Sequence, residues 1–255
     1  MIQSPLEQFN VIALKSFYRG ELFNNAGYID ITITNATLFF FITGIFIAIF
    51  VLFVLEQIKL VPNTWQWMFE NVYEFAVTLI EQNIGVKGRS YFPLIFSLFV
   101  VLLFGNLIGM VPYSFTISSH IILTFSLALA IFIGINIIGL REHGLHFFTF
   151  FIPQGAPPAL IPFLIFIEII SYIFRVFSLS IRLFANMMSG HTLLKIMAGF
   201  SWSMISLSGV LYYAHLLPLI IVFALIGLEM GIAILQAYVF TVLICFYFKD
   251  ALYLH

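Results

Sequence analysis

The sequence predicts an all-α membrane protein with about five membrane helices and one interfacial amphipathic helix. Of its 255 residues, 62% are hydrophobic and 8% are charged, whereas soluble domains carry about 25% charged residues. The apolar residues gather in runs long enough to cross a hydrocarbon core of about 30 Å. We therefore expect residues 1–255 to form a single integral membrane domain in lipid.

Composition also excludes several classes of protein. The formal net charge of −1 argues against a nucleic-acid partner, because nucleic acids are bound through excess positive charge. Cys245 is the single cysteine, which excludes an internal disulfide and a cysteine metal cluster. His143 and His146 lie three residues apart without a third ligand nearby, so neither a metal nor another cofactor is expected.

The first third of the chain is expected to form a surface segment, one membrane helix and one surface helix. Residues 1–36 are mixed and polar, and we expect them to precede the membrane as an N-terminal surface segment. Residues 37–55 carry no charge and have the length of one spanning helix. In residues 62–83 a polar helical stripe lies opposite an apolar one that includes tryptophan, which predicts an amphipathic helix on the membrane surface.

Two further spanning helices are expected in the middle of the chain. Residues 91–111 follow a basic loop and end at Pro112, with Asn106 as their strongly polar interior residue. Residues 117–140 form the next apolar run, with Asn136 near its end. Each run has about the length of one membrane pass.

The last two helices are expected to be long and strongly tilted, packed as an antiparallel hairpin. In residues 159–199 no proline follows Pro162, so nothing interrupts a helix of about 60 Å, twice the hydrocarbon thickness. Ordinary spanning helices tilt by only about 20°, so a straight helix of this length must tilt much further. Residues 205–248 also exceed one span, with Pro218 as a possible kink.

The first long segment carries charges that simple spanning does not require. Glu168, Arg175 and Arg182 are spaced by seven residues and share nearly one helix face. Asn186 extends this stripe, whereas His191, nine residues after Arg182, lies about 180° away. Charged residues within membranes face a partner, a cavity or an ion path. Glu168 and Arg175 could simply neutralise each other, but this leaves Arg182 unexplained.

The second long segment supplies polar groups at matching depths. Glu229 and Gln236 are seven residues apart and share one helix face. A turn centred near Gly209 brings Glu229 level with His191, and Gln236 level with Arg182. The pairing of His191 with Glu229 has two interpretations: a proton relay, or two polar groups that only bury each other.

Small residues are expected to let the two long helices approach closely. These residues are Gly227, Gly231 and Ala233, on the second long segment.

These residues together describe an interrupted proton path. Histidine and a desolvated glutamate exchange protons near neutral pH, whereas arginine keeps its proton. His191 and Glu229 on one side are thus separated by Arg182 from Glu168 on the other. Protons cross such a chain only if a moving partner, with a carboxylate of its own, carries them past the arginine.

Residues 178–194, SLSIRLFANMMSGHTLL, resemble the signature of the subunit a family of the F-type ATP synthase. The resemblance continues through GNLIGMVPYSFT, PFLIFIEIISYIFRVFSLSIRLFAN and LEMGIAILQAYVFTVL, and it covers most of the chain from about residue 105 onwards. It implies a proton-translocating stator subunit with two offset half-channels, which is not an enzyme by itself but belongs to a complex that makes ATP.

The resemblance also implies roles for individual residues around the arginine. Arg182 corresponds to the essential arginine that faces the ring of c subunits. Asn186 and Gln236 correspond to its polar neighbours. Ser178, one turn before Arg182, is expected to shape the surroundings of the guanidinium.

The remaining site residues correspond to the two half-channels. His191 and Glu229 match the acid–base pair of the inlet, on the intermembrane or periplasmic side. Glu168 matches the carboxylate of the outlet, towards the matrix or cytoplasm.

The implied partners are the c-ring, the peripheral stalk, other Fo subunits and the lipid membrane. The implied location is the mitochondrial inner membrane, with a bacterial plasma membrane as the alternative. A different class of function is a self-contained ion channel or voltage sensor that uses Arg175 and Arg182. Voltage sensors repeat basic residues at every third position, and this pattern is absent here.

Overall fold

The computed structural model describes residues 4–21, 28–56, 58–111, 114–144, 146–147, 160–205 and 214–253. Five of its helices are long and apolar enough to cross a membrane. They are α1 (Asn35–Glu56), η2 with α3 (Val86–Tyr91 and Phe92–Gly109), α4 (Ile121–His143), α5 (Ile161–Ile205) and α7 (Leu216–Leu252). A further helix, α2 (Thr64–Asn83), lies between α1 and η2. The predicted all-α membrane fold is therefore confirmed.

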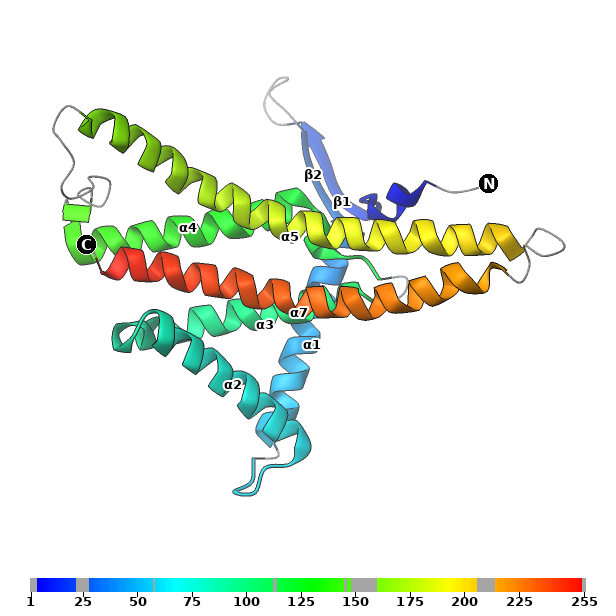
Figure 1. Cartoon of the computed structure of the whole chain (residues 1–255), viewed down its shortest axis with the longest axis horizontal. Helices are drawn as coiled ribbons and strands as arrows, with labels where there is room; N and C mark the ends of the chain where they lie inside the picture. The colour runs from blue at the N-terminus through cyan, green and yellow to red at the C-terminus, as the bar shows by residue number, and fades with distance from the viewer. Residues whose placement is uncertain are drawn as a thin grey trace.

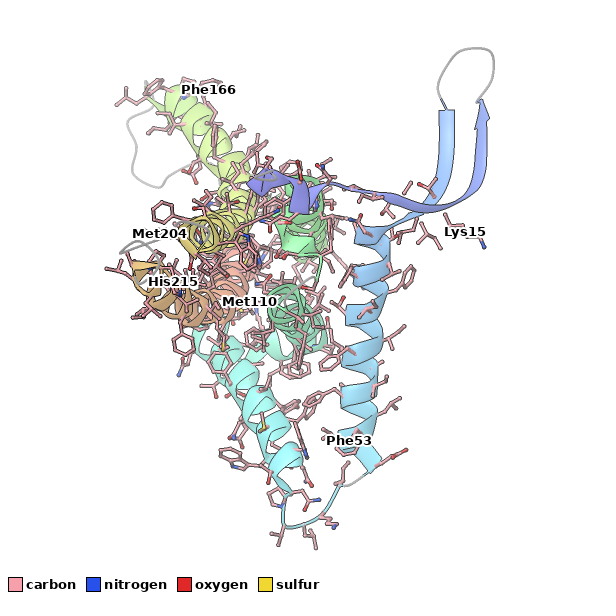
Figure 2. The ribbon with its side chains drawn as sticks, turned by 90° about the vertical axis from the view of Figure 1, so that its right-hand side faces the viewer. Lys15, Phe53, Met110, Phe166, Met204 and His215 are labelled. Carbon is pink, nitrogen blue, oxygen red and sulfur yellow. The ribbon has the colours of Figure 1, made fainter. Side chains whose placement is uncertain are left out.

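A β-hairpin precedes the first membrane helix and was not predicted. Strands β1 (Ala13–Glu21) and β2 (Tyr28–Thr34) pair antiparallel, and the hairpin projects beside the start of α1 (Figure 2). The alternation YIDITIT in β2, rich in β-branched residues, is the signal that indicates a strand. A short 3₁₀ helix, η1 (Pro5–Phe9), contacts α5.

The first membrane helix begins where threonines can cap it. The Thr34 hydroxyl accepts a hydrogen bond from the Thr37 backbone N–H, at 3.3 Å, and the Thr34 N–H donates to the Thr37 hydroxyl at 2.9 Å. Such reciprocal bonds satisfy donors that a helix start leaves free. Beyond this cap α1 is apolar on nearly all sides, and most of it is exposed.

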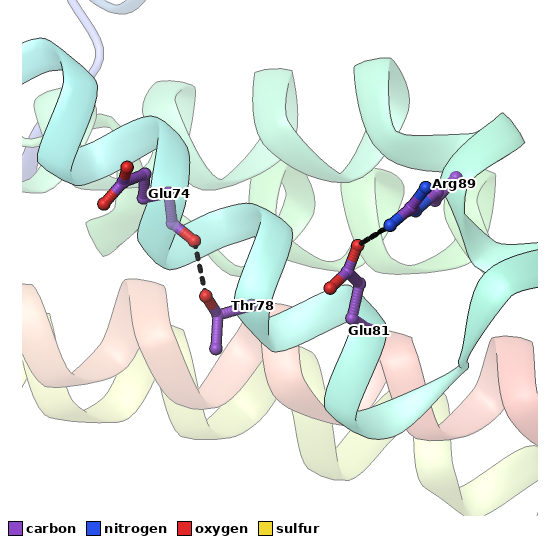
Figure 3. Close-up of polar contacts among 4 residues, drawn as sticks. All are labelled: Glu74, Thr78, Glu81 and Arg89. Atoms are coloured by element: carbon purple, nitrogen blue, oxygen red, sulfur yellow. Dashed lines mark hydrogen bonds and ion pairs between the residues drawn. The ribbon is translucent and has the colours of Figure 1, made fainter.

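Helix α2 presents its acidic side chains outward, as its amphipathic pattern predicts. Glu81 accepts two hydrogen bonds from Arg89, at 2.9 and 2.6 Å, and both side chains are exposed (Figure 3). Gln66 departs from the pattern because it is buried. Its side-chain amide accepts a hydrogen bond from the Lys59 backbone N–H and donates one to the Lys59 carbonyl oxygen. These two bonds hold the segment that connects α1 to α2.

The packed core lies where α3, α4, α5 and α7 meet. Its most buried apolar side chains come from all four helices and include Ile95, Ile135, Leu183, Ile244 and Phe248. Because this region is packed on all sides, it fixes the register between the long helices and the two helices behind them.

Helices α5 and α7 pack antiparallel and form the longest feature of the molecule (Figure 1). Helix α5 continues to Ile205, beyond the predicted end at residue 199. In this last part Ser203 donates to the Phe200 carbonyl one turn earlier, and Ser201 donates to the His215 carbonyl next to the start of α7. Helix α7 begins at Leu216 rather than residue 205. Pro218 therefore lies in the first turn, where no intrahelical N–H is required, and not at an internal kink. The predicted turn near Gly209 lies outside the described residues.

The long hairpin runs across the direction of α1. Figure 1 shows α5 and α7 crossing the upright α1, and Figure 2, turned by 90°, shows the two long helices nearly end-on beside it. Helix α4 packs on α5, and α3 packs on both α7 and α1. Helices α3 and α4 thus lie between the hairpin and α1. Among the described residues, no element covers the opposite face of the hairpin.

The loop between α3 and α4 contains a histidine outside the membrane spans. His120 stacks on Phe115 with ring centroids 4.9 Å apart, and its Nε2 is buried. Burial lowers the pKa of His120 from its usual value of 6.5. The folded state therefore binds fewer protons at this position than the unfolded state. Its contribution to stability is present above the usual pKa of 6.5 and is lost as the pH falls below that value towards the lowered pKa of the folded state.

We predict that His120→Phe, which keeps an aromatic ring against Phe115, reduces the pH dependence of stability. The variant should lose less thermal stability than the wild type when the pH falls from about 7.5 to about 5.5. The measurement is the melting temperature of the detergent-solubilised protein at both pH values. An equal loss in both proteins would contradict the prediction.

Candidate proton-transfer site between the long helices

The site centres on a carboxyl group buried between α5 and α7. Glu229 on α7 is 8% exposed, and neither of its carboxyl oxygens has a hydrogen-bond partner within the described part of the chain. The carboxyl group lies directly over Gly190 of α5, where an added Cβ would be 2.6 Å from Oε1 and 3.1 Å from Cδ. The absence of a side chain at Gly190 therefore leaves the space that this carboxyl group occupies.

Glu229 shares a small cavity with groups from α5. The cavity is lined by Met110, Met187, Ile232 and the polar residues Asn186, His191 and Glu229, and it has room for about one water molecule. The structure thus brings His191 and Glu229 together. Asn186 lines this cavity although the sequence placed it beside Arg182. It lies four residues after Arg182, and this spacing rotates its side chain by about 40° around the helix relative to Arg182.

His191 is also held from the loop that follows α3. Its Nε2 lies 3.1 Å from the Thr116 hydroxyl oxygen. The same hydroxyl lies 3.0 Å from the carbonyl oxygen of Gly109, at the end of α3. Thr116 is 5% exposed, so this contact is part of the packed interior and links α5 to α3.

Helix α3 contacts the other side of the site through an amide. Asn106, 1% exposed, donates from Nδ2 to the Ala233 carbonyl oxygen of α7, at 3.3 Å. Ala233 is fully buried there, whereas Gly227 and Gly231 have no atom within 4 Å of an added Cβ. The prediction that these two glycines permit close approach of α5 and α7 is therefore wrong. Gly190 occupies that contact instead.

Arg182 lies on the uncovered face of α5. Its side chain is exposed, as is Ser178 one turn earlier. Arg182 forms no hydrogen bond or ion pair with the residues that the structure describes, although it lies near enough to Tyr247 to interact electrostatically. Gln236 of α7 is 6% exposed and so lies within the packed helices.

Glu168 belongs to a separate polar cluster further along the hairpin. The Arg175 guanidinium lies 3.8 Å from the Glu168 carboxylate and 2.9 Å from that of Asp250 on α7. The rings of Tyr172 and Tyr247 lie on the same guanidinium, with centroids at 5.5 and 5.6 Å. Arg175 is thus held mainly by Asp250, and Glu168 is only its weaker partner, so the two do not simply neutralise each other.

Several of these residues were not found from the sequence. Asp250 and Thr116 act through contacts that span 75 positions each, and helical periodicity carries no information at that distance. The sequence offered Glu168, seven residues before it on the same helix, as the partner of Arg175. Only the hairpin register, unknown in advance, brings Asp250 of α7 to this guanidinium.

The fold and the site define a class: a multi-pass helical membrane protein with ionisable groups buried between its two longest helices. A sequence profile of the ATP synthase A chain family matches residues 37–249. The chain belongs to this family.

Full-length relatives support the same family. The protein named ATP synthase subunit a in Marchantia polymorpha is 51% identical over 260 residues, covering 100% of both chains. Its counterpart in Chondrus crispus is 50% identical over 255 residues, covering 100% of this chain and 98% of the relative. In Brassica napus the identity is 48% over 260 residues, with coverages of 99% and 97%.

Family membership confirms the resemblance found in the sequence. The chain is a non-catalytic subunit of the proton-translocating Fo part of ATP synthase. Its plant and algal relatives and its five apolar helices support a multi-pass location in the mitochondrial inner membrane.

We predict that Gly190→Ala displaces the Glu229 carboxyl group without preventing assembly, because the far end of a glutamate side chain can move away from the new methyl group. Proton-driven ATP synthesis by the reconstituted complex should fall by about tenfold or more, since misplacing a reacting group by about 1 Å is costly. Gly199→Ala is the matched control on the same helix, where nothing lies within 4 Å of an added Cβ. Equal rates in both variants would contradict the prediction.

We predict that Asp250→Asn destabilises the subunit, because Arg175 loses its closer carboxylate and its ion pair within the described chain is then the 3.8 Å contact with Glu168. The expected cost is about 2 kcal/mol, or several degrees in melting temperature. The control is Glu81→Gln, which breaks an exposed pair with Arg89 and should cost at most about 1 kcal/mol. For both variants the measurement is the temperature at which the subunit is released from the solubilised complex. Equal shifts in Asp250→Asn and Glu81→Gln would contradict the prediction.

Proposed function

We propose that this chain is the stator subunit that conducts protons to and from the c-ring through two half-channels separated by Arg182. The proposal rests on one observation: the polar groups of the hairpin lie in separate places along it. His191 and Glu229 share a buried cavity, Glu168 belongs to a different cluster, and Arg182 stands exposed with no ion-pair partner in the described chain.

The inlet half-channel is assigned to the cavity beside Glu229. Its carboxyl oxygens are buried without a protein hydrogen bond, an arrangement that is costly for a purely structural group. A carboxyl group beside a space that admits water can instead accept and release a proton. His191 and Asn186 line the same cavity and provide further groups for the transfer.

The outlet half-channel is assigned to Glu168. Its side chain is 37% exposed, and its contact with Arg175 is long, at 3.8 Å. Because Asp250 is the closer partner of Arg175, Glu168 can change its protonation state without leaving that guanidinium unpaired. This supports a role in accepting protons.

The partner surface is assigned to the face of α5 that carries Arg182. Ser178, Ala185 and Ser189 are also exposed on this face. Ser178 lies four residues before Arg182 and seven before Ala185, and Ser189 lies seven residues after Arg182. These spacings keep the side chains on one side of the helix. Small residues let another helix approach closely, and a fixed cation attracts a carboxylate. These features fit a ring of helices that each carry one carboxylate.

The mechanism follows from the difference between arginine and the groups that titrate. A proton from the inlet neutralises a ring carboxylate, which can then rotate into lipid. At the outlet another carboxylate loses its proton and is held by Arg182, which keeps its own charge. A membrane potential supplies about 2.3 kcal/mol per charge for each 100 mV or so, so proton flow drives rotation in one direction.

We predict that Arg182→Ala abolishes proton-driven ATP synthesis, because deprotonated ring carboxylates are no longer held and protons can cross without driving rotation. The measurement is ATP synthesis by the complete enzyme in proteoliposomes under an imposed proton gradient. Arg89→Ala, which removes an exposed guanidinium from the surface pair with Glu81, should retain synthesis. Coupled synthesis in Arg182→Ala would overturn the proposal, as would proton conduction by the purified chain without a c-ring.

A further inference from the structure

The loop that follows α3 forms a hydrogen-bonded cap that extends to His191. The Ser114 hydroxyl lies 2.8 Å from the carbonyl oxygen of Ile108 and 2.9 Å from that of Gly109. The Thr116 hydroxyl lies 3.0 Å from the Gly109 carbonyl oxygen. Helix ends leave carbonyl groups short of intrahelical donors. The Ile108 carbonyl also accepts from the Val111 backbone N–H, at 3.1 Å, whereas the Gly109 carbonyl is within reach of both hydroxyls.

Each hydroxyl has one hydrogen to donate. A carbonyl oxygen cannot donate, so the 3.0 Å contact of Thr116 with the Gly109 carbonyl is a hydrogen bond only if the Thr116 hydroxyl donates it. Turning the Thr116 hydrogen towards His191 would leave two oxygen atoms facing each other at 3.0 Å with no hydrogen between them. The Thr116 oxygen therefore faces His191 Nε2, 3.1 Å away, as an acceptor.

The position of Thr116 is fixed by its neighbours. Its backbone carbonyl oxygen accepts a 2.6 Å hydrogen bond from Ser119. A Cβ at Gly109 would lie 2.8 Å from the Thr116 methyl carbon and 3.2 Å from its Cα, so only glycine lets the loop approach α3 this closely. Phe115 stacks on His120 on one side and packs beside Phe39 of α1 on the other.

We propose that Thr116 is a positioning residue that holds His191 in the tautomer whose hydrogen is on Nε2. This inference rests on the proposed function of His191 in the inlet. The neutral ring then has its lone pair on Nδ1. A transported proton binds at Nδ1 to give the imidazolium, and it leaves from Nδ1 to restore the same neutral tautomer. The other hydrogen stays on Nε2 throughout, hydrogen-bonded to the Thr116 oxygen. The proton is held by the ring and is not passed through it.

Thr116→Val tests the hydroxyl because valine has nearly the same shape without a hydrogen-bonding group. Proton-driven ATP synthesis by the reconstituted complex should fall by about tenfold, the order of effect seen when a group that orients a histidine is removed. Thr116→Ser, which keeps the hydroxyl, should restore the rate. The matched control is Thr124→Val, since Thr124 is equally buried and bonds only to backbone carbonyls at the start of α4.

A spectroscopic measurement separates positioning from a structural role. Solid-state ¹⁵N NMR of the histidine-labelled complex should show the Nε2–H tautomer for His191, identified by difference from His191→Gln. In Thr116→Val the other tautomer should gain population. An Nδ1–H tautomer in the wild type would overturn the inference, and this result does not depend on whether the valine variant assembles. An unchanged rate and tautomer in Thr116→Val would also overturn it.

The same variants distinguish this inference from the function on which it rests. Full coupled synthesis in His191→Gln would remove the proposed role of His191 and the inference with it. Loss of synthesis in His191→Gln together with wild-type behaviour of Thr116→Val would overturn the inference alone.

Discussion

The arrangement depends on the contact of the Glu229 carboxyl group with the backbone of α5. A carboxyl group can be buried between two helices only if one of them has no side chain at the point of contact, and Gly190 provides that. The contact fixes the depth at which α5 and α7 are aligned. That alignment in turn brings His191 to the same cavity and Asp250 to Arg175. The Gly190 contact, the shared cavity and the Arg175–Asp250 pair thus belong to one alignment of α5 and α7.

Helix α3 stabilises the alignment of α5 and α7 from the side of the hairpin that faces α1. Asn106 binds the backbone of α7, while the carbonyl at Gly109 holds the loop that contacts α5. Polar contacts of this kind are retained in membranes because an unsatisfied group has no water to bind. The two long helices are therefore attached to one shorter helix at points only a turn apart. Under the proposed function this attachment keeps the buried groups in place while the opposite face meets the c-ring.

Much of the fold could be predicted from the sequence because long apolar runs permit few structures in lipid. The length of α5 and the absence of an internal proline predicted a helix that exceeds one span, and the spacing of Arg182 and His191 predicted that they face different neighbours. Helix ends were predicted less accurately than helix existence. Helix α5 was expected to end at residue 199, but it continues to Ile205, where Ser201 donates to the His215 carbonyl oxygen near the start of α7. The β-hairpin was missed because its alternation is short and lies in a polar segment.

The exposed guanidinium of Arg182 has a consequence for biogenesis. A cation without a counter-charge costs about 2.5–3.5 kcal/mol at the centre of a membrane helix, and the described chain offers Arg182 no acid. A copy that has not met its partner therefore remains at higher free energy than an assembled one. Under the proposed function, a partner that brings a carboxylate to Arg182 relieves this penalty, so an unassembled subunit is distinguished by its unpaired charge.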